Sequence, residues 1–274
     1  MLLVTAPILG LIVGLVLGLT GAGGSIFAVP LLMWGLGWSL PQAVPVALIA
    51  VCIAAGFGTV VAWDTRMVRY RAALLMAAVS WLFAPLGLRV AGQLPAMWLT
   101  LAFAGVLVIV GFRMLRQAAA NPRDAQIVRA DVNRHLVCRD AATGRFEWTA
   151  AAFAVISAIG AGAGFLAGLL GVGGGFVIVP ALRASTDLGM HSAIATSLMA
   201  IALISAGTVT AAALQGHVMP WRIALPFVGG ALVGMLAGRR LAQHIAGPRL
   251  QQAFALAMLA VAVGLAVPAL GSLI

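Results

Sequence analysis

Eight apolar runs alternate with polar connectors along the chain. They cover residues 6–33, 41–63, 72–92, 96–115, 149–182, 190–214, 222–242 and 250–273. A helix of about 20 apolar residues crosses a hydrocarbon core of about 30 Å, and most of the runs reach that length. One polar stretch, residues 116–148, separates two sets of four runs. The pattern predicts an all-α polytopic membrane protein.

Composition and charge support the membrane assignment. Of 274 residues, 63% are hydrophobic and 8% are charged, whereas soluble domains carry about 25% charged residues. A soluble enzyme is therefore excluded. The net charge of +10 comes from 16 arginines without any lysine. These arginines lie between the apolar runs, which is typical of cytoplasmic loops and not of a nucleic-acid surface.

Motifs for catalysis or metal binding are missing from the sequence. It contains no HExxH, GxSxG or GxxxxGK[ST], and the glycine clusters do not match GxGxxG. His135 and Cys138 are two potential ligands on one polar stretch, which is too few for a metal site. We therefore expect no catalytic residues, no metal and no cofactor.

The two sets of runs are copies of one unit. Shifting the second half back by 150 residues places GLLGVGGGFVIVPAL (168–182) on GLTGAGGSIFAVPLL (18–32). Gly10 and Gly14 then fall on Gly160 and Gly164. With a one-residue slip, Gly87 falls on Gly238. We divide the chain into repeat one (1–115), a cytoplasmic linker (116–148) and repeat two (149–274).

The arginines favour inverted copies. If the first run of each repeat folds back at its glycine cluster, fourteen of the sixteen arginines share one face, and only Arg89 and Arg222 oppose them. Simple spans divide the arginines eleven to five. As half-helices, residues 6–20 and 25–37 would measure about 22 and 20 Å, shorter than the hydrocarbon core. We expect two inverted repeats, each a broken, re-entrant hairpin with a glycine tip plus three transmembrane helices. Eight simple spans in two parallel repeats are the alternative.

The glycine clusters are the strongest candidate for a functional site. Helices broken at matching positions of two halves indicate a transporter binding site. Free N–H groups at the start of the second half-helix favour an anion, and glycine allows close approach. The predicted contacts are Gly21, Gly23, Gly24 and Ser25 in repeat one, and Gly171, Gly173, Gly174 and Gly175 in repeat two. The glycines spaced by four before each cluster (10, 14, 18 and 160, 164, 168) indicate helix packing instead.

Polar side chains add a second candidate feature. Ser197, Ser205, Thr208 and Gln215 fall within about 80° of one another on a helix. Ser192 and Thr196 lie on a neighbouring face, and Gln42 is the counterpart of Ser192. The hydroxyls either contact the substrate or bond carbonyls of their own helix. We include Gln42, Ser192, Thr196, Ser197, Ser205 and Thr208 in the predicted substrate site.

Two copies of G-L-x-G-x-G-G-[SG]-x3-V-P, the second leading into AIATSL (193–198), resemble the TauE/SafE sulfite exporter family of membrane permeases. The resemblance covers both halves of the chain. It implies transport of sulfite, thiosulfate or organosulfonates. Repeat one has AVPVAL (43–48) at the position of AIATSL, so it lacks the hydroxyls.

The sequence thus predicts a non-enzymatic inner-membrane permease for a small sulfur-containing anion, with export favoured. Its expected partners are that anion and the lipid bilayer, with no nucleic acid, and a homodimer stays open. Two alternatives remain. One is an uptake permease for the same anions, and the other is a membrane accessory subunit that does not transport.

The inverted arrangement predicts the side of each connector. In a background without Cys52 and Cys138, Ser39→Cys and Ser272→Cys should react with an impermeant maleimide from the periplasm. Both termini are predicted to lie outside, and the fold-back returns the chain to that side at residue 39. Ala120→Cys should not react there. Labelling of position 39 only from the cytoplasm, with position 272 outside, would contradict the fold-back.

Overall fold

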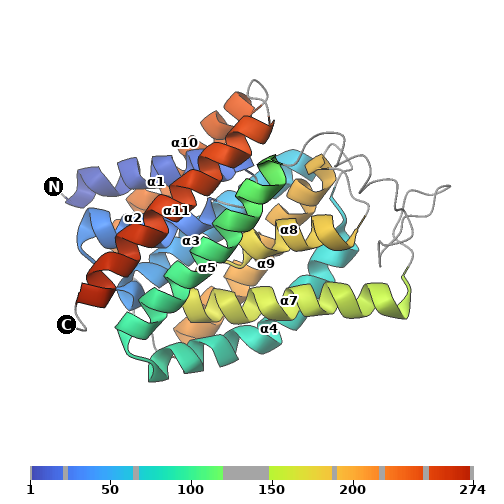
Figure 1. The fold of residues 1–274 in the computed structure, drawn as a ribbon, viewed down its shortest axis with the longest axis horizontal. Coiled ribbons are helices and arrows are strands. Elements are labelled where there is room, and N and C mark those ends of the chain that lie inside the picture. The colour runs from blue at the N-terminus through green and yellow to red at the C-terminus, as the bar shows by residue number, and fades with distance from the viewer. Residues whose placement is uncertain are drawn as a thin grey trace.

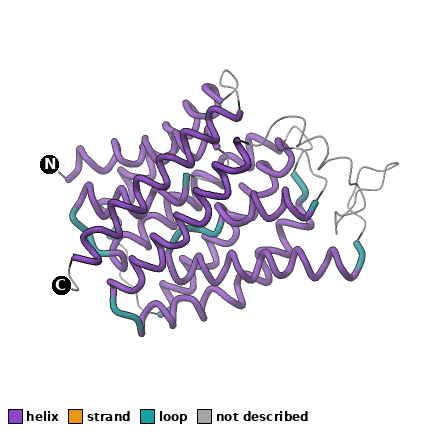
Figure 2. The backbone as a smooth tube through the Cα atoms, in the orientation of Figure 1, coloured by secondary structure: helices purple, strands orange, loops and turns teal. Residues whose placement is uncertain are grey.

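The computed structural model describes residues 2–20, 24–63, 68–119, 148–186, 190–215, 220–242 and 247–271, which are almost entirely helical (Figure 2). The helices in these residues are α1 (Leu2–Thr20), α2 (Ser25–Leu36), α3 (Leu40–Trp63), α4 (Tyr70–Gln93), α5 (Ala96–Ala119), α7 (Ala150–Leu170), α8 (Gly175–Ser185), α9 (Met190–Leu214), α10 (Trp221–Ala242) and α11 (Gly247–Gly271). Most of the predicted linker lies outside the described residues, so the repeat boundaries stay a prediction.

Helix length and composition confirm a polytopic membrane protein. Six of the described helices, α3, α4, α5, α7, α9 and α10, are long and apolar enough to cross a bilayer. Shorter apolar stretches occupy α1, α2 and α11. Large apolar side chains such as Leu82 and Val60 are exposed on the outside of the bundle, as expected where lipid forms the surroundings.

Helix α2 folds back along α1. A Cβ added at Gly24, just before α2, would meet Leu17 of α1, and one added at Gly35 near the end of α2 would meet Leu9. Successive positions of α2 therefore meet earlier and earlier positions of α1, so the two helices run antiparallel. Helix α8 likewise packs on α7 and runs back beside it (Figure 1). Each first run is therefore a hairpin and not a single span.

The first arm of hairpin one, α1, is longer than the sequence predicted, whereas α7 begins where its apolar run begins. Helix α7 has 21 residues and α1 has 19, which correspond to about 32 and 29 Å. The second arms, α2 and α8, have only 12 and 11 residues. Helix α1 gains its extra length at its N-terminal end. In α7, Thr149 accepts from the N–H of Ala152 and starts the helix at its first apolar residue. Each hairpin is therefore asymmetric, with one long and one short arm.

Glycines bring the first arms into backbone contact with long spans. Cβ atoms added at Gly10, Gly14 and Gly18 of α1 would meet the backbone of α10 around Phe227, Ala231 and Met235. Cβ atoms added at Gly160, Gly164 and Gly168 of α7 would meet α4 around Met76, Ser80 and Ala84. This confirms the packing role predicted for the six glycines, since only a missing side chain permits such an approach.

The helix contacts obey the symmetry of the repeats. Helix α1 packs on α10 as α7 packs on α4, and α3 contacts α10 as α9 contacts α4. Helices α3 and α9 pack on each other, as do α5 and α11, so each pairs with its own counterpart. In Figure 1, α1 and α7 run in opposite directions, as do α5 and α11. This is the arrangement expected of inverted copies; the orientation relative to a bilayer stays a prediction.

The α3–α9 contact is where a pseudo-two-fold axis between inverted copies is expected. The Sγ of Cys52 lies 3.4 Å from the carbonyl oxygen of Ala202, to which it donates, and the two residues are 150 positions apart. That separation equals the repeat offset. A residue can touch its own counterpart only near the axis that relates the copies. The centre of the molecule is therefore the crossing of α3 and α9.

Helix α7 provides a matched test of the glycine contacts. Gly160→Ala should lower the free energy of unfolding by about 1–3 kcal/mol, the usual cost of overpacking, because its Cβ would lie 2.6 Å from the carbonyl oxygen of Met76. Gly162→Ala should be neutral or slightly stabilising, since nothing lies within 4 Å of its Cβ position. Thermal unfolding in detergent compares the two. Equal melting temperatures would contradict the contact.

Candidate functional site

The tip of the second hairpin is built from left-handed glycines. Gly171, Gly173 and Gly174 have φ of 69°, 66° and 67°, values that residues with a Cβ rarely adopt. The N–H of Gly171 closes α7 by donating to the carbonyl oxygen of Ala167 at 2.9 Å. Residues 171–174 then turn the chain through the bundle to the start of α8, drawn in teal in Figure 2.

The N-terminus of α8 is buried, and two of its backbone N–H groups have no carbonyl acceptor among the described residues. Its first bonds run from the N–H groups of Val177 and Ile178 to the carbonyl oxygen of Gly174, at 3.1 and 3.3 Å. Within the described ranges, no backbone carbonyl accepts from the N–H of Gly175 or Phe176. Both residues are buried. Buried donors of this kind are costly unless a ligand accepts from them.

This tip reaches the crossing of α3 and α9. A Cβ added at Gly173 would lie 2.8 Å from Ser205 Oγ, 3.3 Å from a methyl of Val51 and 3.6 Å from a methyl of Ile201. Val51 lies near the middle of α3, and Ile201 and Ser205 near the middle of α9. The structure thus brings together Gly173 and Ser205, two of the predicted site residues.

Ser205 is the exceptional hydroxyl of the polar stripe. Its side chain is fully buried, and in the described part of the chain its Oγ has no hydrogen-bond partner. The other hydroxyls of the stripe bond their own helix: Ser197 donates to the carbonyl of Ile194 at 2.8 Å, and Thr208 to that of Ile204 at 2.9 Å. Their donors are therefore engaged, whereas the Ser205 hydroxyl is available to a ligand.

Three other predicted contacts lie elsewhere. Thr196 is about 180° from Ser205 around α9, and its hydroxyl oxygen accepts from the backbone N–H of Arg69 at 3.0 Å. Ser192 is half-buried one turn before Thr196. Gln42 is exposed and its Oε1 accepts from the N–H of Ser39 at 3.2 Å, at the start of α3. The printed bonds of Thr196 and Gln42 therefore lie away from the tip of the second hairpin.

The tip of the first hairpin is described only in part. Gly21 and Gly23 lie outside the described residues, while Gly24 and Ser25 are buried. Gly24 has φ of −61° and lies beside Leu17, whereas its counterpart Gly174 has φ of 67° and lies beside Ala163. The counterpart of Leu17 is Ala167, one helical turn from Ala163. The two hairpins therefore differ by a shift of about 6 Å.

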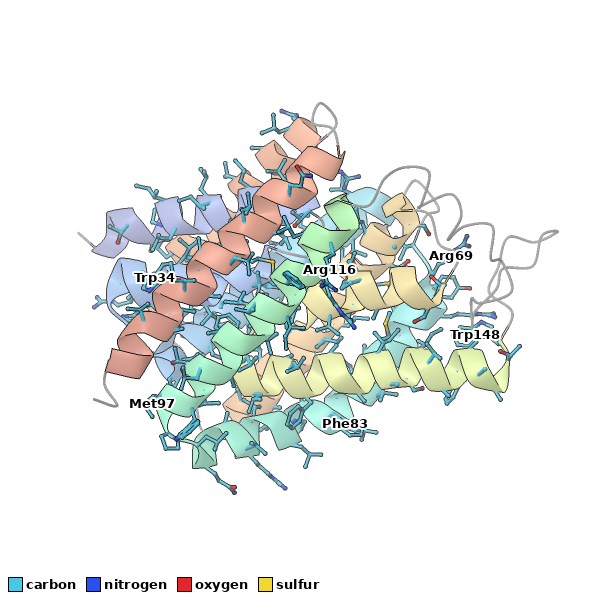
Figure 3. The ribbon with its side chains drawn as sticks, viewed as in Figure 1. Trp34, Arg69, Phe83, Met97, Arg116 and Trp148 are labelled. Atoms are coloured by element: carbon cyan, nitrogen blue, oxygen red, sulfur yellow. The ribbon has the colours of Figure 1, made fainter. Side chains whose placement is uncertain are left out.

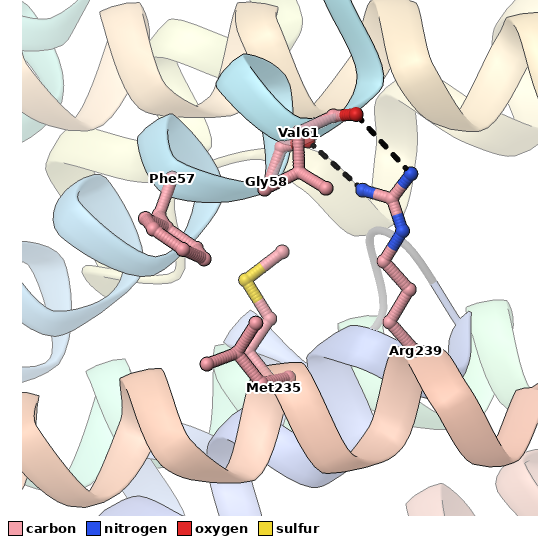
Figure 4. Close-up of a pocket in the computed structure, with 6 residues that line it drawn as sticks. Phe57, Gly58, Val61, Met235 and Arg239 are labelled. Atoms are coloured by element: carbon pink, nitrogen blue, oxygen red, sulfur yellow. Dashed lines mark hydrogen bonds between the residues drawn. The ribbon is translucent and has the colours of Figure 1, made fainter. Parts of the chain in front are cut away.

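Sequence reasoning missed the role of Arg239. Its Nη1 and Nη2 donate to the carbonyl oxygens of Gly58 and Val61, at 3.4 and 3.5 Å, across a small hollow between α3 and α10 (Figure 4). A cation near the end of a helix satisfies its last carbonyls and its dipole.

A second missed contact joins α4 to α9. The indole N–H of Trp81 donates to the carbonyl oxygen of Leu203 at 2.9 Å, and its ring fills the notch left by Gly207. Arg69 starts α4 at the end of the molecule where Trp148 precedes α7 (Figure 3). Together with the bond between Arg69 and Thr196, these contacts fix α4 against the face of α9 that points away from the tip.

Six long apolar helices and two helical hairpins define a multi-pass membrane protein. Helices broken at matching positions of two halves are typical of a transporter. The sequence model of the sulfite exporter TauE/SafE family matches residues 6–265. The chain belongs to this family, which is a family of membrane transporters.

Curated relatives carry the same general description. A "Probable membrane transporter protein" of Xylella fastidiosa (strain Temecula1) is 33% identical over 86% of this chain and 83% of its own length. "Probable membrane transporter protein YunE" of Bacillus subtilis (strain 168) is 29% identical over 83% of this chain and 84% of its own length. No solved structure matches the chain.

The contribution of the hydrogen bond between Arg69 and Thr196 to stability can be measured separately from anion binding. Thr196→Val should lower stability by about 1 kcal/mol, because it leaves the partly buried N–H of Arg69 without an acceptor. Anion affinity should not change, since Thr196 faces away from Ser205. Thr210→Val on the same helix is the control, because Thr210 is exposed and bonds only its own helix. Weaker anion binding with unchanged melting would instead place Thr196 in the site.

Proposed function

We propose that the protein is an inner-membrane permease for a small sulfur-containing oxyanion, namely sulfite, thiosulfate or an organosulfonate, and that it works in export. The observation that carries this proposal is the buried tip of the second hairpin. There the free N–H groups of Gly175 and Phe176 start a helix whose dipole favours negative charge. The unpartnered hydroxyl of Ser205 lies beside Gly173, two residues before this helix begins.

The charge distribution supports an anion as the substrate. All six acidic residues of the chain lie outside the described helices: Asp64, Asp124, Asp131, Asp140, Glu147 and Asp187. No carboxylate on these helices therefore repels an anion at the tip. For the same reason the helices offer no carboxylate for a proton or a sodium ion, which an uphill uptake system would use.

The membrane potential supplies a reason for export. A monoanion that leaves a cell with a negative interior gains roughly 2.3 kcal/mol per 100 mV. Export needs no coupled ion under these conditions, whereas uptake needs one. The arginines add the orientation: with the fold-back, fourteen of sixteen lie on one face, which we take as cytoplasmic. Both termini are then periplasmic and the linker is cytoplasmic.

The identity of the anion is inferred from the family. Its description names a sulfite exporter, while the names of the relatives specify only a membrane transporter. Backbone N–H groups and one hydroxyl suit the oxygens of any tetrahedral or pyramidal oxyanion. The choice of sulfur compounds therefore comes from the family and the choice of an anion from the site.

Reconstituted protein tests both parts of the proposal. Proteoliposomes loaded with sulfite should release it faster than protein-free vesicles, and a potential that is negative inside should accelerate release. Gly173→Val should abolish the flux, because φ of 66° and the contact with Ser205 leave no room for a side chain. Gly162→Val, at an open position of α7, is the control.

The controls separate the alternatives. Monodispersity on size exclusion must match between the two variants, so that loss of flux is not loss of fold. Inward movement of sulfite that depends on a proton or sodium gradient would support the uptake permease. If sulfite, thiosulfate and methanesulfonate neither cross the vesicle membrane nor raise the melting temperature of the protein, the protein is not a permease for them. The membrane accessory subunit is then the favoured alternative.

A further inference from the structure

The surroundings of Gly173 are polar on one side only. The three nearest atoms to its Cβ position are the Ser205 hydroxyl oxygen and methyl carbons of Val51 and Ile201. The hydroxyl comes from α9 in repeat two, and Val51 comes from α3 in repeat one. An anion at this tip would meet a hydroxyl donor on the α9 side and hydrocarbon on the α3 side.

The position of Ser205 in the repeat explains this difference. Ser205 follows Ala202 by three residues, and Ala55 follows Cys52 by three. Since Cys52 contacts Ala202 on the pseudo-two-fold axis, Ser205 and Ala55 occupy equivalent places on opposite sides of it. Both are fully buried. A duplicated unit with a hydroxyl in both copies would present two donors at the axis, but this chain presents one.

The hydroxyl of Ser205 is also free in a way that its neighbours are not. Thr59, Thr208 and Thr210 all donate to the carbonyl four residues earlier in their own helix. The Ser205 hydroxyl makes no such bond to Ile201, although that bond would satisfy it at once. A buried hydroxyl that forgoes this bond and lies against the N-terminal tip of α8 indicates a ligand oxygen as its partner.

We propose that Ser205 is the side-chain hydroxyl that binds the anion, and that Ala55 makes the site one-sided. The Ser205 hydroxyl and the N–H groups of Gly175 and Phe176 hold oxygens of one oxyanion. The side of the anion that faces α3 receives no donor from position 55. The inference rests on the proposed function, because it assigns roles within the same anion site.

Two substitutions test the two halves of the proposal. Loss of a hydroxyl that donates to a charged oxygen should weaken binding about ten- to a hundred-fold, so Ser205→Ala should reduce the affinity for sulfite, sulfate and methanesulfonate by that factor. Ala55→Ser supplies a donor on the second side. It should strengthen sulfate, which carries oxygens on every side, relative to methanesulfonate, which carries a methyl group.

The measurements are anion affinities from thermal shifts in detergent, with unfolding in the absence of anions as the structural readout. Ser205→Ala should unfold at the same or a higher temperature without anions, because it removes a buried hydroxyl that has no partner. Thr210→Val is the matched control. It should change neither the anion affinities nor the ratio between the sulfate and methanesulfonate affinities.

Unchanged affinity in Ser205→Ala, or a loss of stability without anions that equals the loss of affinity, would overturn the role of Ser205. An unchanged ratio of the sulfate and methanesulfonate affinities in Ala55→Ser would overturn the one-sided site. Either result leaves a working permease and the proposed function intact. If the unmodified protein binds none of the three anions, the proposed function fails and the inference falls with it.

Discussion

Backbone contact through glycine is the constraint on which the other features depend. In a bilayer, lipid tails are as apolar as side chains, so helices associate through close packing and not through the hydrophobic effect. The stripes on α1 and α7 bring whole helix faces to within contact distance of α10 and α4. The long first arm of each hairpin is thereby held in register with a full span. That register determines the depth at which the glycine tip ends and the short arm begins.

The tip itself breaks the main rule of membrane helices. Backbone donors in the hydrocarbon region must be satisfied, and irregular backbone is tolerated only inside protein or beside a cavity. Residues 171–174 meet this requirement because α3 and α9 enclose them. The buried N–H groups at the start of α8 are the remaining exception. A bound anion removes that exception, so binding chemistry and the folding of the hairpin share one set of atoms.

Much of this arrangement is readable from the sequence because it depends on spacing. Glycines four residues apart predicted the packed faces, and the 150-residue offset predicted which helices correspond. The length of the first arm was underestimated for α1, because the helix continues beyond residue 6 toward the N-terminus. The individual roles of Thr196, Ser205 and Arg239 were not readable. They depend on helix rotation and on which carbonyl lies opposite, and both are properties of the packed bundle.

The one-turn offset between the hairpins bears on how a duplicated chain works. Gly24 and Gly174 hold matching positions with opposite backbone handedness, beside Leu17 and Ala163. One sequence pattern therefore supports two geometries within a single molecule. Exchanging them between the repeats would generate a second state with the same kinds of contact, related to the first by a two-fold rotation about the α3–α9 crossing. The free-energy difference between two such states depends on the positions where the copies disagree. Those positions would set the populations of the two states, while the anion gradient and the membrane potential set the direction of net flux.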